Sequence, residues 1–217
     1  MTINCKGKLV DLTSPKVMGI LNLTPDSFFD GGKYKDEISI LKQVEYMLEH
    51  GATFIDMGAY SSRPGADHVA EDEELQRMTP VIDLILKNFP DTLISIDTFR
   101  SKVAAESIEH GAAIINDIAA GNLDENMFAT IAKHQVPYIM MHMKGTPQSM
   151  QKEAVYDNMV NDLRFYFSEK IRETTSKKIN DVIIDPGFGF ANIIRAHDVK
   201  EASECIKLVE ALKENTL

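Results

Sequence analysis

Tryptophan is absent from this 217-residue chain, aromatic residues make up only 7% of it, and cysteine occurs twice. The two cysteines, Cys5 and Cys205, lie far apart and outside any C-x-x-C spacing, so the sequence predicts neither a disulfide framework nor a zinc site. Hydrophobic residues still make up 44% of the chain, which is enough for one well-packed core. We therefore expect a single globular domain over residues 1–217.

Positive charge and long apolar runs are also scarce. The chain has 23 Lys and Arg residues against 33 Asp and Glu, which gives a formal net charge of -10 at pH 7. A negative field repels nucleic acid and anionic membranes, so we expect neither as a partner, although a local basic pocket stays open. No segment approaches the roughly 18 apolar residues of a membrane span, and the first residues have no apolar signal core. These absences favour a cytoplasmic protein.

What the sequence does contain is one repeated unit, in which an apolar run leads into polar residues and then into a helical pattern. The run Val17–Leu21 has no helical periodicity, which is typical of a buried strand, and it ends in a polar loop that begins at Asn22. An amphipathic helix is predicted over Asp36–His50, with Gly51 as its stop. Strands that alternate with helices pair in parallel through helical crossovers, so this unit predicts a (β/α) barrel.

The unit recurs along the chain, after a hairpin predicted over Ile3–Thr13. Six further strands are predicted, at Thr53–Met57, Leu93–Ile96, Ala113–Ile115, Val136–Met141, Val182–Ile184 and Ile193–Ile194. Helices are predicted over Glu71–Phe89 with a break or kink at Pro80, and over Ser101–His110, Glu125–His134, Tyr156–Glu173 and Val199–Lys213.

Polar side chains stand where most of these strands end, namely Asn22, Asp56, Asp97, Asn116, His142 and Asp185. In (β/α) barrels the active site lies at the carboxyl ends of the strands, so these positions are candidates for a site. The carboxylates of Asp97 and Asp185 and the amide of Asn116 suit a planar ligand with several N–H donors, such as an aminopyrimidinone. The alternative is structural: Asp97 caps the helix that follows it, and Asn116 and Asp185 start turns.

Two further groups of residues are typical of anion binding. In the loop residues 61–65, Ser62 and Arg63 precede the stiffening Pro64, and a guanidinium forks onto phosphate oxygens; a solvated loop arginine gives the same pattern. Arg195 and His197 lie two residues apart at the end of an apolar run, so they face one side of a strand. They are candidates for a second anionic group.

Taken in order, these segments resemble the dihydropteroate synthases, folate-pathway enzymes of the pterin-binding (β/α)8 barrel family. The matching pieces are Met18–Phe28, Asp56–Gly65, Ser95–Thr98, Asn116–Asp117, Met141–Met143, Asp185–Phe190 and Arg195–Asp198. The resemblance implies a transferase that condenses 6-hydroxymethyl-7,8-dihydropterin diphosphate with p-aminobenzoate and releases dihydropteroate and pyrophosphate. It also implies a homodimer and a target of sulfonamides.

The resemblance also implies roles for single residues. Asp97, Asn116 and Asp185 would hold the pterin ring. The diphosphate would be bound by Arg63, Arg195 and His197, and these three residues with Asp97 and Asp185 make up the expected catalytic set. Asn22 would reach a Mg²⁺ cofactor that neutralises the leaving charge. Further substrate contacts are expected from Ser62, Pro64, Met141 and Phe190, with Pro64 and Phe190 lining the p-aminobenzoate slot.

The chain departs from the family pattern near residues 190–193. Asp185–Asn192 runs directly into Ile193–Asp198, and in the family these segments end the sixth and the eighth strand. A parallel crossover needs roughly 10 to 12 residues, so the two strands cannot be joined as neighbours. The segment with the seventh strand and its Ser-Arg-Lys-type loop is absent from this sequence. A deletion, two pieces joined across an omitted segment and an altered topology at this junction are the three explanations, of which we favour the first two. We therefore predict a barrel that lacks one β/α unit and exposes two strand edges.

This gap leaves other functions open. A truncated barrel that retains pterin through Asp97, Asn116 and Asp185 without turnover is one alternative, because the missing loop would supply a lysine to the pterin. A folate-dependent methyltransferase on the same scaffold is another. Arg63 and the loop Thr24–Asp26 disfavour the methyltransferase, since they suit a diphosphate.

Overall fold

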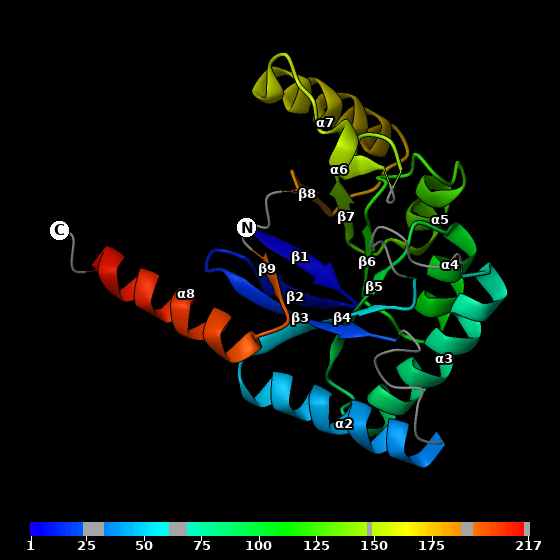
Figure 1. The fold of residues 1–217 in the computed structure, drawn as a ribbon, viewed down its shortest axis with the longest axis vertical. Coiled ribbons are helices and arrows are strands. Elements are labelled where there is room, and N and C mark those ends of the chain that lie inside the picture. The colour runs from blue at the N-terminus through cyan, green and yellow to red at the C-terminus, as the bar shows by residue number, and fades with distance from the viewer. Residues whose placement is uncertain (24–32, 61–68, 147–148, 188–192, 215–217) are drawn as a thin grey trace.

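The computed structural model describes residues 1–23, 33–60, 69–146, 149–187 and 193–214. Its centre is a seven-stranded sheet that curls into part of a barrel, with helices on its outer side (Figure 1). The strands are β3 (Lys16–Asn22), β4 (Ala52–Gly58), β5 (Leu93–Asp97), β6 (Ile114–Asp117), β7 (Tyr138–Met141), β8 (Val182–Asp185) and β9 (Ile193–Ala196). The helices are α2 (Lys33–Glu49), α3 (Glu71–Asn88), α4 (Ser101–Glu109), α5 (Met127–His134), α6 (Met150–Glu153), α7 (Met159–Ser176) and α8 (Val199–Glu214).

Strands that follow one another in the chain are neighbours in the sheet from β3 to β8, and all of these pairs are parallel. Helices carry the chain back between them, as parallel pairing requires. The last strand, β9, lies on the other side of β3, where Val17 pairs with Ile194. The order is therefore β8-β7-β6-β5-β4-β3-β9, and the two strands that are closest in the C-terminal sequence lie at opposite edges.

This order agrees with the short segment between Asp185 and Ile193. In the described part of the chain β8 and β9 are not paired with each other, and each has one strand neighbour. The sheet is thus a curled half-barrel of parallel strands with an open side (Figure 1). The predicted (β/α)8-type barrel that lacks one β/α unit is confirmed.

The predicted N-terminal hairpin is also confirmed. Strand β1 (Thr2–Cys5) pairs antiparallel with β2 (Lys8–Asp11), and Lys6 and Gly7 turn the chain with φ of 55° and 81°. Buried side chains of the hairpin and of the sheet form one apolar cluster inside the half-barrel: Ile3, Cys5, Val10, Leu12, Met18, Phe54, Leu93, Ala113, Ile114, Ile139 and Ile193. The hairpin therefore closes the end of the half-barrel at which the strands begin.

A larger core lies between the outer face of the sheet and the helices. The packing is closest at Gly19 of β3, where a Cβ atom would lie 2.6 Å from Met47 Sδ of α2 and 3.0 Å from Val199 Cγ2 of α8. Both helices therefore rest directly on β3, and only glycine fits between them. Figure 1 shows α8 starting beside β9 and β3 and running away from the sheet.

Two details differ from the prediction. Of the break or kink predicted at Pro80, the break is wrong, because α3 continues through this exposed residue from Glu71 to Asn88. Proline removes one backbone hydrogen bond, but buried side chains on both sides of it, including Met78 and Ile82, hold the helix on the sheet. The four-residue helix α6 is not among the predicted elements.

No segment of the sequence was expected to provide the roughly 18 apolar residues of a membrane span. Within the ranges that the structure describes, no helix combines the length and the apolar character that a membrane span requires.

Candidate active site

A polar layer follows the apolar cluster inside the half-barrel. Side chains along a strand alternate between its two faces, so the residue two positions after an interior residue faces the interior again. The next interior positions after the apolar cluster are two residues further along each strand, and in β5 also four. They are occupied by Asp56 in β4, Ser95 and Asp97 in β5, Asn116 in β6, Met141 in β7, Asp185 in β8 and Arg195 in β9. The interior therefore becomes polar at the carboxyl ends of the strands, which is where a site was predicted.

Asp56 lies at the centre of this layer. Its carboxylate is fully buried, and its Oδ2 accepts hydrogen bonds from Arg195 Nε at 2.5 Å and from Asn116 Nδ2 at 3.2 Å. The other oxygen, Oδ1, is buried without a hydrogen-bond partner among the described residues. The sequence places Asp56 among the polar strand ends without giving it a role. An aspartate within an otherwise apolar buried strand is the signal that marks it.

Arg195 reaches across the half-barrel from the edge strand β9. Besides Asp56 on β4, its guanidinium donates to Asp97 Oδ2 on β5 at 2.7 Å. Burial by itself lowers the pKa of Arg195, but the carboxylates of Asp56 and Asp97 outweigh it and raise that pKa above its usual range. The predicted anion ligand thus lies between two carboxylates, and it ties one edge of the sheet to the strands in its middle.

Asp97 ends β5 with its carboxylate directed at Arg195. Burial raises the pKa of Asp97 well above its usual range, the negative charges of Asp56 and Asp117 act in the same direction, and Arg195 acts against them. The alternative that Asp97 caps the following helix is wrong. Helix α4 begins at Ser101, whose N–H donates to Asp124 Oδ2 at 2.7 Å. The position of Asp97 is therefore not explained by helix capping.

Asn116 and Asp185 line the same interior. Asn116 is in register with Asp97, and its side chain donates to Asp56. Asp185 is in register with the half-buried Met141, and its Oδ1 accepts a hydrogen bond from Gly187 N at 2.8 Å. Asp185 therefore does shape a turn, as the structural alternative states, and its carboxylate still lies at the carboxyl end of β8.

The remaining predicted site residues divide into two groups. Asn22 is half-buried at the end of β3, and His197 is exposed directly after β9. Ser62, Arg63, Pro64 and Phe190 lie outside the described residues, so their roles stay predictions.

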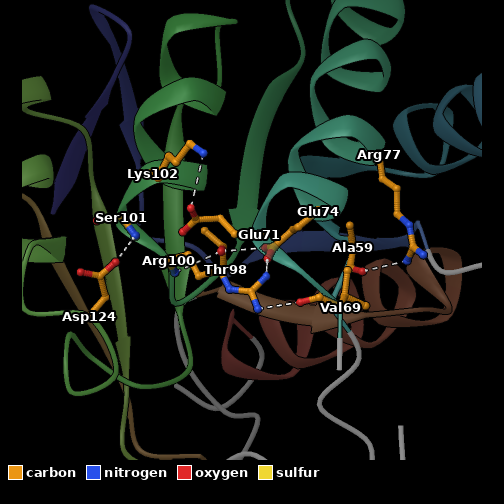
Figure 2. A network of polar contacts seen from close by, with 10 residues as sticks. All are labelled: Ala59, Val69, Glu71, Glu74, Arg77, Thr98, Arg100, Ser101, Lys102 and Asp124. Carbon is orange, nitrogen blue, oxygen red and sulfur yellow. Dashed lines mark hydrogen bonds and ion pairs between the residues drawn. The ribbon is translucent and has the colours of Figure 1, made fainter. Parts of the chain in front are cut away.

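A buried ion pair that the sequence did not indicate joins Glu74 to Arg100 (Figure 2). Glu74 of α3 is fully buried and Arg100 is 8% exposed, and Arg100 Nη1 lies 2.5 Å from Glu74 Oε2. Glu74 stands one turn before Met78 on the buried side of α3. A charged residue on the apolar stripe of a helix is the pattern that would have found it.

The family assignment follows from the comparison with known proteins. The sequence model of the family described as pterin binding enzyme matches residues 18–216. The dihydropteroate synthase of Escherichia coli strain K12 is 41% identical over 192 residues, which cover 88% of this chain and 67% of that protein. The mitochondrial folate synthesis bifunctional protein of Pisum sativum is 44% identical over 182 residues, 81% of this chain and 35% of that protein. The chain thus spans about a third of this longer relative.

Solved structures agree with the sequence comparison. A Yersinia pestis dihydropteroate synthase in complex with a sulfonamide drug matches with a TM-score of 0.88 at 32% identity, over 100% of both chains. A Xanthomonas albilineans dihydropteroate synthase with 4-aminobenzoic acid matches with a TM-score of 0.86 at 26% identity, over 98% of each chain. With its half-barrel, its polar interior layer and these relatives, the chain belongs to the pterin-binding enzyme family, alongside the dihydropteroate synthases.

Proposed function

We propose that this chain acts as a dihydropteroate synthase, which condenses 6-hydroxymethyl-7,8-dihydropterin diphosphate with p-aminobenzoate in folate biosynthesis. The observation that carries the proposal is the layer of Asp56, Asp97, Asn116 and Arg195 inside the half-barrel. The carboxylates of Asp56 and Asp97 each accept a hydrogen bond from the guanidinium of Arg195, so the site is built to bind a planar group with several N–H donors. The 2-aminopyrimidinone edge of a pterin offers donors of the same kind.

Recognition of the ring would rest on hydrogen bonds to Asp97, Asn116 and Asp185. A site built on such bonds rejects ligands without the donors, because its buried acceptors are then left unpaired. Asp97 accepts on both oxygens only when it is ionised. The buried Oδ1 of Asp56 offers one further acceptor. Pterin binding would therefore exchange the guanidinium of Arg195 for the donors of the ring.

Release of Arg195 from the carboxylates would make it available to the diphosphate. With His197 and Arg63, it would bind the phosphate oxygens and stabilise the charge of the leaving group. The bond between the pterin methylene carbon and the diphosphate oxygen breaks, and its electron pair leaves with the diphosphate. The amine nitrogen of p-aminobenzoate forms the new C–N bond and loses a proton. No covalent bond to the protein is required.

Mg²⁺ is part of this proposal, with Asn22 as its protein contact. The described residues hold no cluster of three His, Cys, Asp or Glu side chains, and Asn22 offers a single amide oxygen. Mg²⁺ commonly keeps several waters and is held by one or two protein ligands together with substrate phosphates. The residues therefore fit an ion that arrives with the diphosphate. When bound, the ion would neutralise part of the leaving charge.

The binding of p-aminobenzoate is supported by the relatives. The Xanthomonas albilineans structure contains 4-aminobenzoic acid, and the Yersinia pestis structure contains a sulfonamide drug. We infer that this chain takes p-aminobenzoate in a slot that includes Pro64 and Phe190, and that a sulfonamide competes for it.

A second candidate is a pterin-binding protein without turnover. The open side of the half-barrel between β8 and β9 favours it, because the loop that would bring a lysine to the pterin is missing from the sequence. A folate-dependent methyltransferase is less well supported, since Arg195 and His197 suit a phosphate.

Product formation decides between the candidates. Purified chain with Mg²⁺, the pterin diphosphate and p-aminobenzoate would be followed by mass spectrometry for dihydropteroate and pyrophosphate. We expect both products in equal amounts above a control without protein, and their loss in Asp97→Asn. A folded chain that binds pterin and forms no product would be the binding protein, whereas retention of methyltetrahydrofolate would indicate the methyltransferase.

A further inference from the structure

The N-terminal hairpin has two outer strand edges, one on β1 and one on β2. Its sheet contains only these two strands, and in the described part of the chain neither of them pairs with a strand of the half-barrel. An uncovered strand edge presents unpaired backbone N–H and C=O groups, which can pair with a further strand. The two edges differ in what they contact.

The edge of β1 is held by the half-barrel. The backbone N–H of Asn4 points away from β2, and it donates to Asp181 Oδ2 at 2.8 Å, directly before β8 begins. This hydrogen bond ties the hairpin to the sheet on one side. The comparable groups on the other side belong to β2.

The hydrogen bonds of the hairpin identify the groups that point outward from β2. Antiparallel residue pairs alternate between pairs that exchange backbone hydrogen bonds and pairs that do not. Leu12 N donates to Met1 O at 2.8 Å, so Leu12 and Val10 face β1, and the backbone groups of Leu9 and Asp11 point away from it. Among the described residues these outward N–H and C=O groups have no hydrogen-bond partner. We call them the free edge of β2.

A cleft of about 690 Å³ lies along the free edge. All four residues of β2 line it, whereas no residue of β1, which the structure describes throughout, does so. Successive side chains of a strand point to opposite faces, so a cleft on one face would be lined by alternate residues of both strands. This cleft therefore follows the edge. Its other wall consists of the first residues of β3, β4 and β5 and of residues 88–92 between α3 and β5.

The cleft has the size of a short extended segment. A strand residue rises about 3.3 Å, the next strand lies about 4.8 Å away and stacked layers lie about 10 Å apart, so one residue takes up roughly 160 Å³. About four residues therefore fit into the cleft, and β2 itself has four residues. Such a segment is long enough to pair with both Leu9 and Asp11.

The walls of the cleft suit apolar side chains at alternate positions. Leu48 of α2, Phe89 after α3 and Leu93 of β5 line it, together with the buried Val10. In a strand that pairs with the free edge, every second side chain would face these groups. Apolar side chains at those positions would be removed from water, which favours binding.

The charge around the cleft favours a basic segment. Two aspartates and two lysines line it, and their formal charges balance: Asp11, Asp91, Lys8 and Lys16. The carboxyl ends of α2 and α3 also lie at the cleft, and helix carboxyl ends carry a negative partial charge. The net charge of -10 of the chain acts in the same direction, because it attracts a cationic partner.

We propose that the free edge of β2 and its cleft bind an extended basic peptide segment, which adds a third strand to the hairpin. Backbone hydrogen bonds to Leu9 and Asp11 would supply the pairing, and apolar side chains at alternate positions would fill the cleft. The cleft lies where the strands of the sheet begin, whereas the polar layer lies at their carboxyl ends. The inference therefore does not rest on the proposed function.

Amide exchange followed by NMR tests the pairing at single residues. In the free chain, the amides of Leu9 and Asp11 should exchange faster than that of Val10, which faces β1. The probe is the peptide acetyl-Lys-Val-Lys-Val-Lys-amide. Its addition should slow exchange at Leu9 and Asp11 and leave Val10 unchanged. Unchanged exchange at Leu9 and Asp11 with saturating peptide would overturn the proposal.

Variants at one position separate the backbone from the side chain. Leu9→Pro removes the outward N–H, and proline is tolerated on an edge strand where the N–H does not face a neighbouring strand. Leu9→Val is the matched control, because it keeps that N–H. In fluorescence anisotropy with a labelled probe we expect Kd to rise about fivefold in Leu9→Pro, as the loss of one hydrogen bond implies, and to stay the same in Leu9→Val. Equal affinities for both variants would contradict pairing through the edge.

Changes in the probe keep the test decisive if Leu9→Pro fails to fold, which thermal unfolding would show. A probe with N-methyl groups on its two valines loses backbone donors and should bind the unchanged chain more weakly. The peptide acetyl-Glu-Val-Glu-Val-Glu-amide, of opposite charge, should also bind more weakly. Equal binding of the methylated probe would overturn strand pairing, and equal binding of the glutamate peptide would overturn the preference for a basic segment.

A second copy of the chain is the competing occupant of the free edge. If copies paired through β2, the amides of Leu9 and Asp11 would be protected without any peptide, and their protection would increase with protein concentration. That result would overturn the peptide proposal. We expect rapid exchange at both amides over the whole concentration range.

Discussion

Asp97 combines a raised pKa with a direct contact to Arg195, and both follow from its place in the half-barrel. It stands at the end of a buried strand, where burial and the neighbouring carboxylates disfavour its charge. The guanidinium of Arg195 compensates part of that cost at 2.7 Å. Hydrogen bonds donated by a ligand stabilise the ionised carboxylate of Asp97, and the proposed pterin ring would donate such bonds.

This raised pKa predicts how pterin binding depends on pH. Ionised Asp97 is the better acceptor, so the affinity for 6-hydroxymethylpterin should increase as the pH rises from about 5 to 8, through the raised pKa of Asp97 of about 7. Fluorescence titration at several pH values measures it, and Asp97→Asn should bind weakly and with a flatter profile. Stability should change in the opposite direction. Because folding raises this pKa, the contribution of Asp97 is present below its unfolded value and is lost as the pH rises through the folded one. A flat affinity profile in the unchanged chain would contradict the role of Asp97.

Arg195 offers a test of the polar layer through stability. Arg195→Met should lower the free energy of unfolding by about 2–3 kcal/mol, because it leaves the buried charge of Asp56 without its ionic partner and with only the hydrogen bond from Asn116. The 38% exposure of the Arg195 side chain keeps the cost below that of a fully buried pair. In the double variant Arg195→Met with Asp56→Asn, much of this loss should be recovered. Urea unfolding of the four proteins gives the coupling. Additive losses in the double variant would show that the two side chains do not interact.

The sequence predicted those residues of the layer that a local pattern marks, and it did not predict contacts between residues that lie far apart in the chain. Asp97 and Asn116 were found because apolar strands end at them. The partners of Arg195 were not, because Asp56 lies 139 residues away in the chain and meets it only through the curl of the sheet. Glu74 was predicted only as part of the helix Glu71–Phe89, although its burial is set by packing against Thr98 and Arg100.

At the scale of single elements, β3 is the strand on which the fold depends most, because two helices rest on it. Gly19→Ala should destabilise the chain by about 1–3 kcal/mol, since the new methyl would lie 2.6 Å from Met47 Sδ. Combined with Met47→Ala, which opens space in α2, the substitution should cost less than the sum of the two single losses. Chemical unfolding measures the cycle. A fully stable Gly19→Ala would mean that α2 does not pack this closely.

Helix α3 shows why element boundaries were less predictable than element types. Proline is a local signal for a break, but the buried side chains around Pro80 gain more by staying on the sheet than one backbone hydrogen bond costs. Helix α6 has only four residues, too few for a periodic pattern. The strands were predicted better, because a run buried on both faces is apolar throughout.

At the scale of the whole molecule, the missing unit was predictable because crossover length is a covalent constraint. The eight residues Asp185–Asn192 are too few for a parallel crossover with a helix, so β8 and β9 had to lie apart, and they lie at opposite edges of the sheet. The sequence could not show that Arg195, from the far edge, would still reach the middle of the layer.

The open edges predict self-association, and a homodimer remains our proposal from the family. Ile184 on the edge strand β8 is 38% exposed, and unpaired strands of this kind attract further chains. Ile184→Lys should weaken association, whereas Val155→Lys, at a 72% exposed position outside the sheet, should not. Light scattering over a range of concentrations measures both. Equal masses for all three proteins at every concentration would argue against association through β8.

The most direct test of the account is whether the interior layer binds a pterin. Calorimetric titration of the folded chain with 6-hydroxymethylpterin should give one site per chain, and Asp97→Asn should weaken it by about tenfold or more. Asp83→Asn, which changes a surface carboxylate beside His110, should bind like the unchanged chain. No binding by the folded chain, or equal binding by Asp97→Asn, would contradict the account.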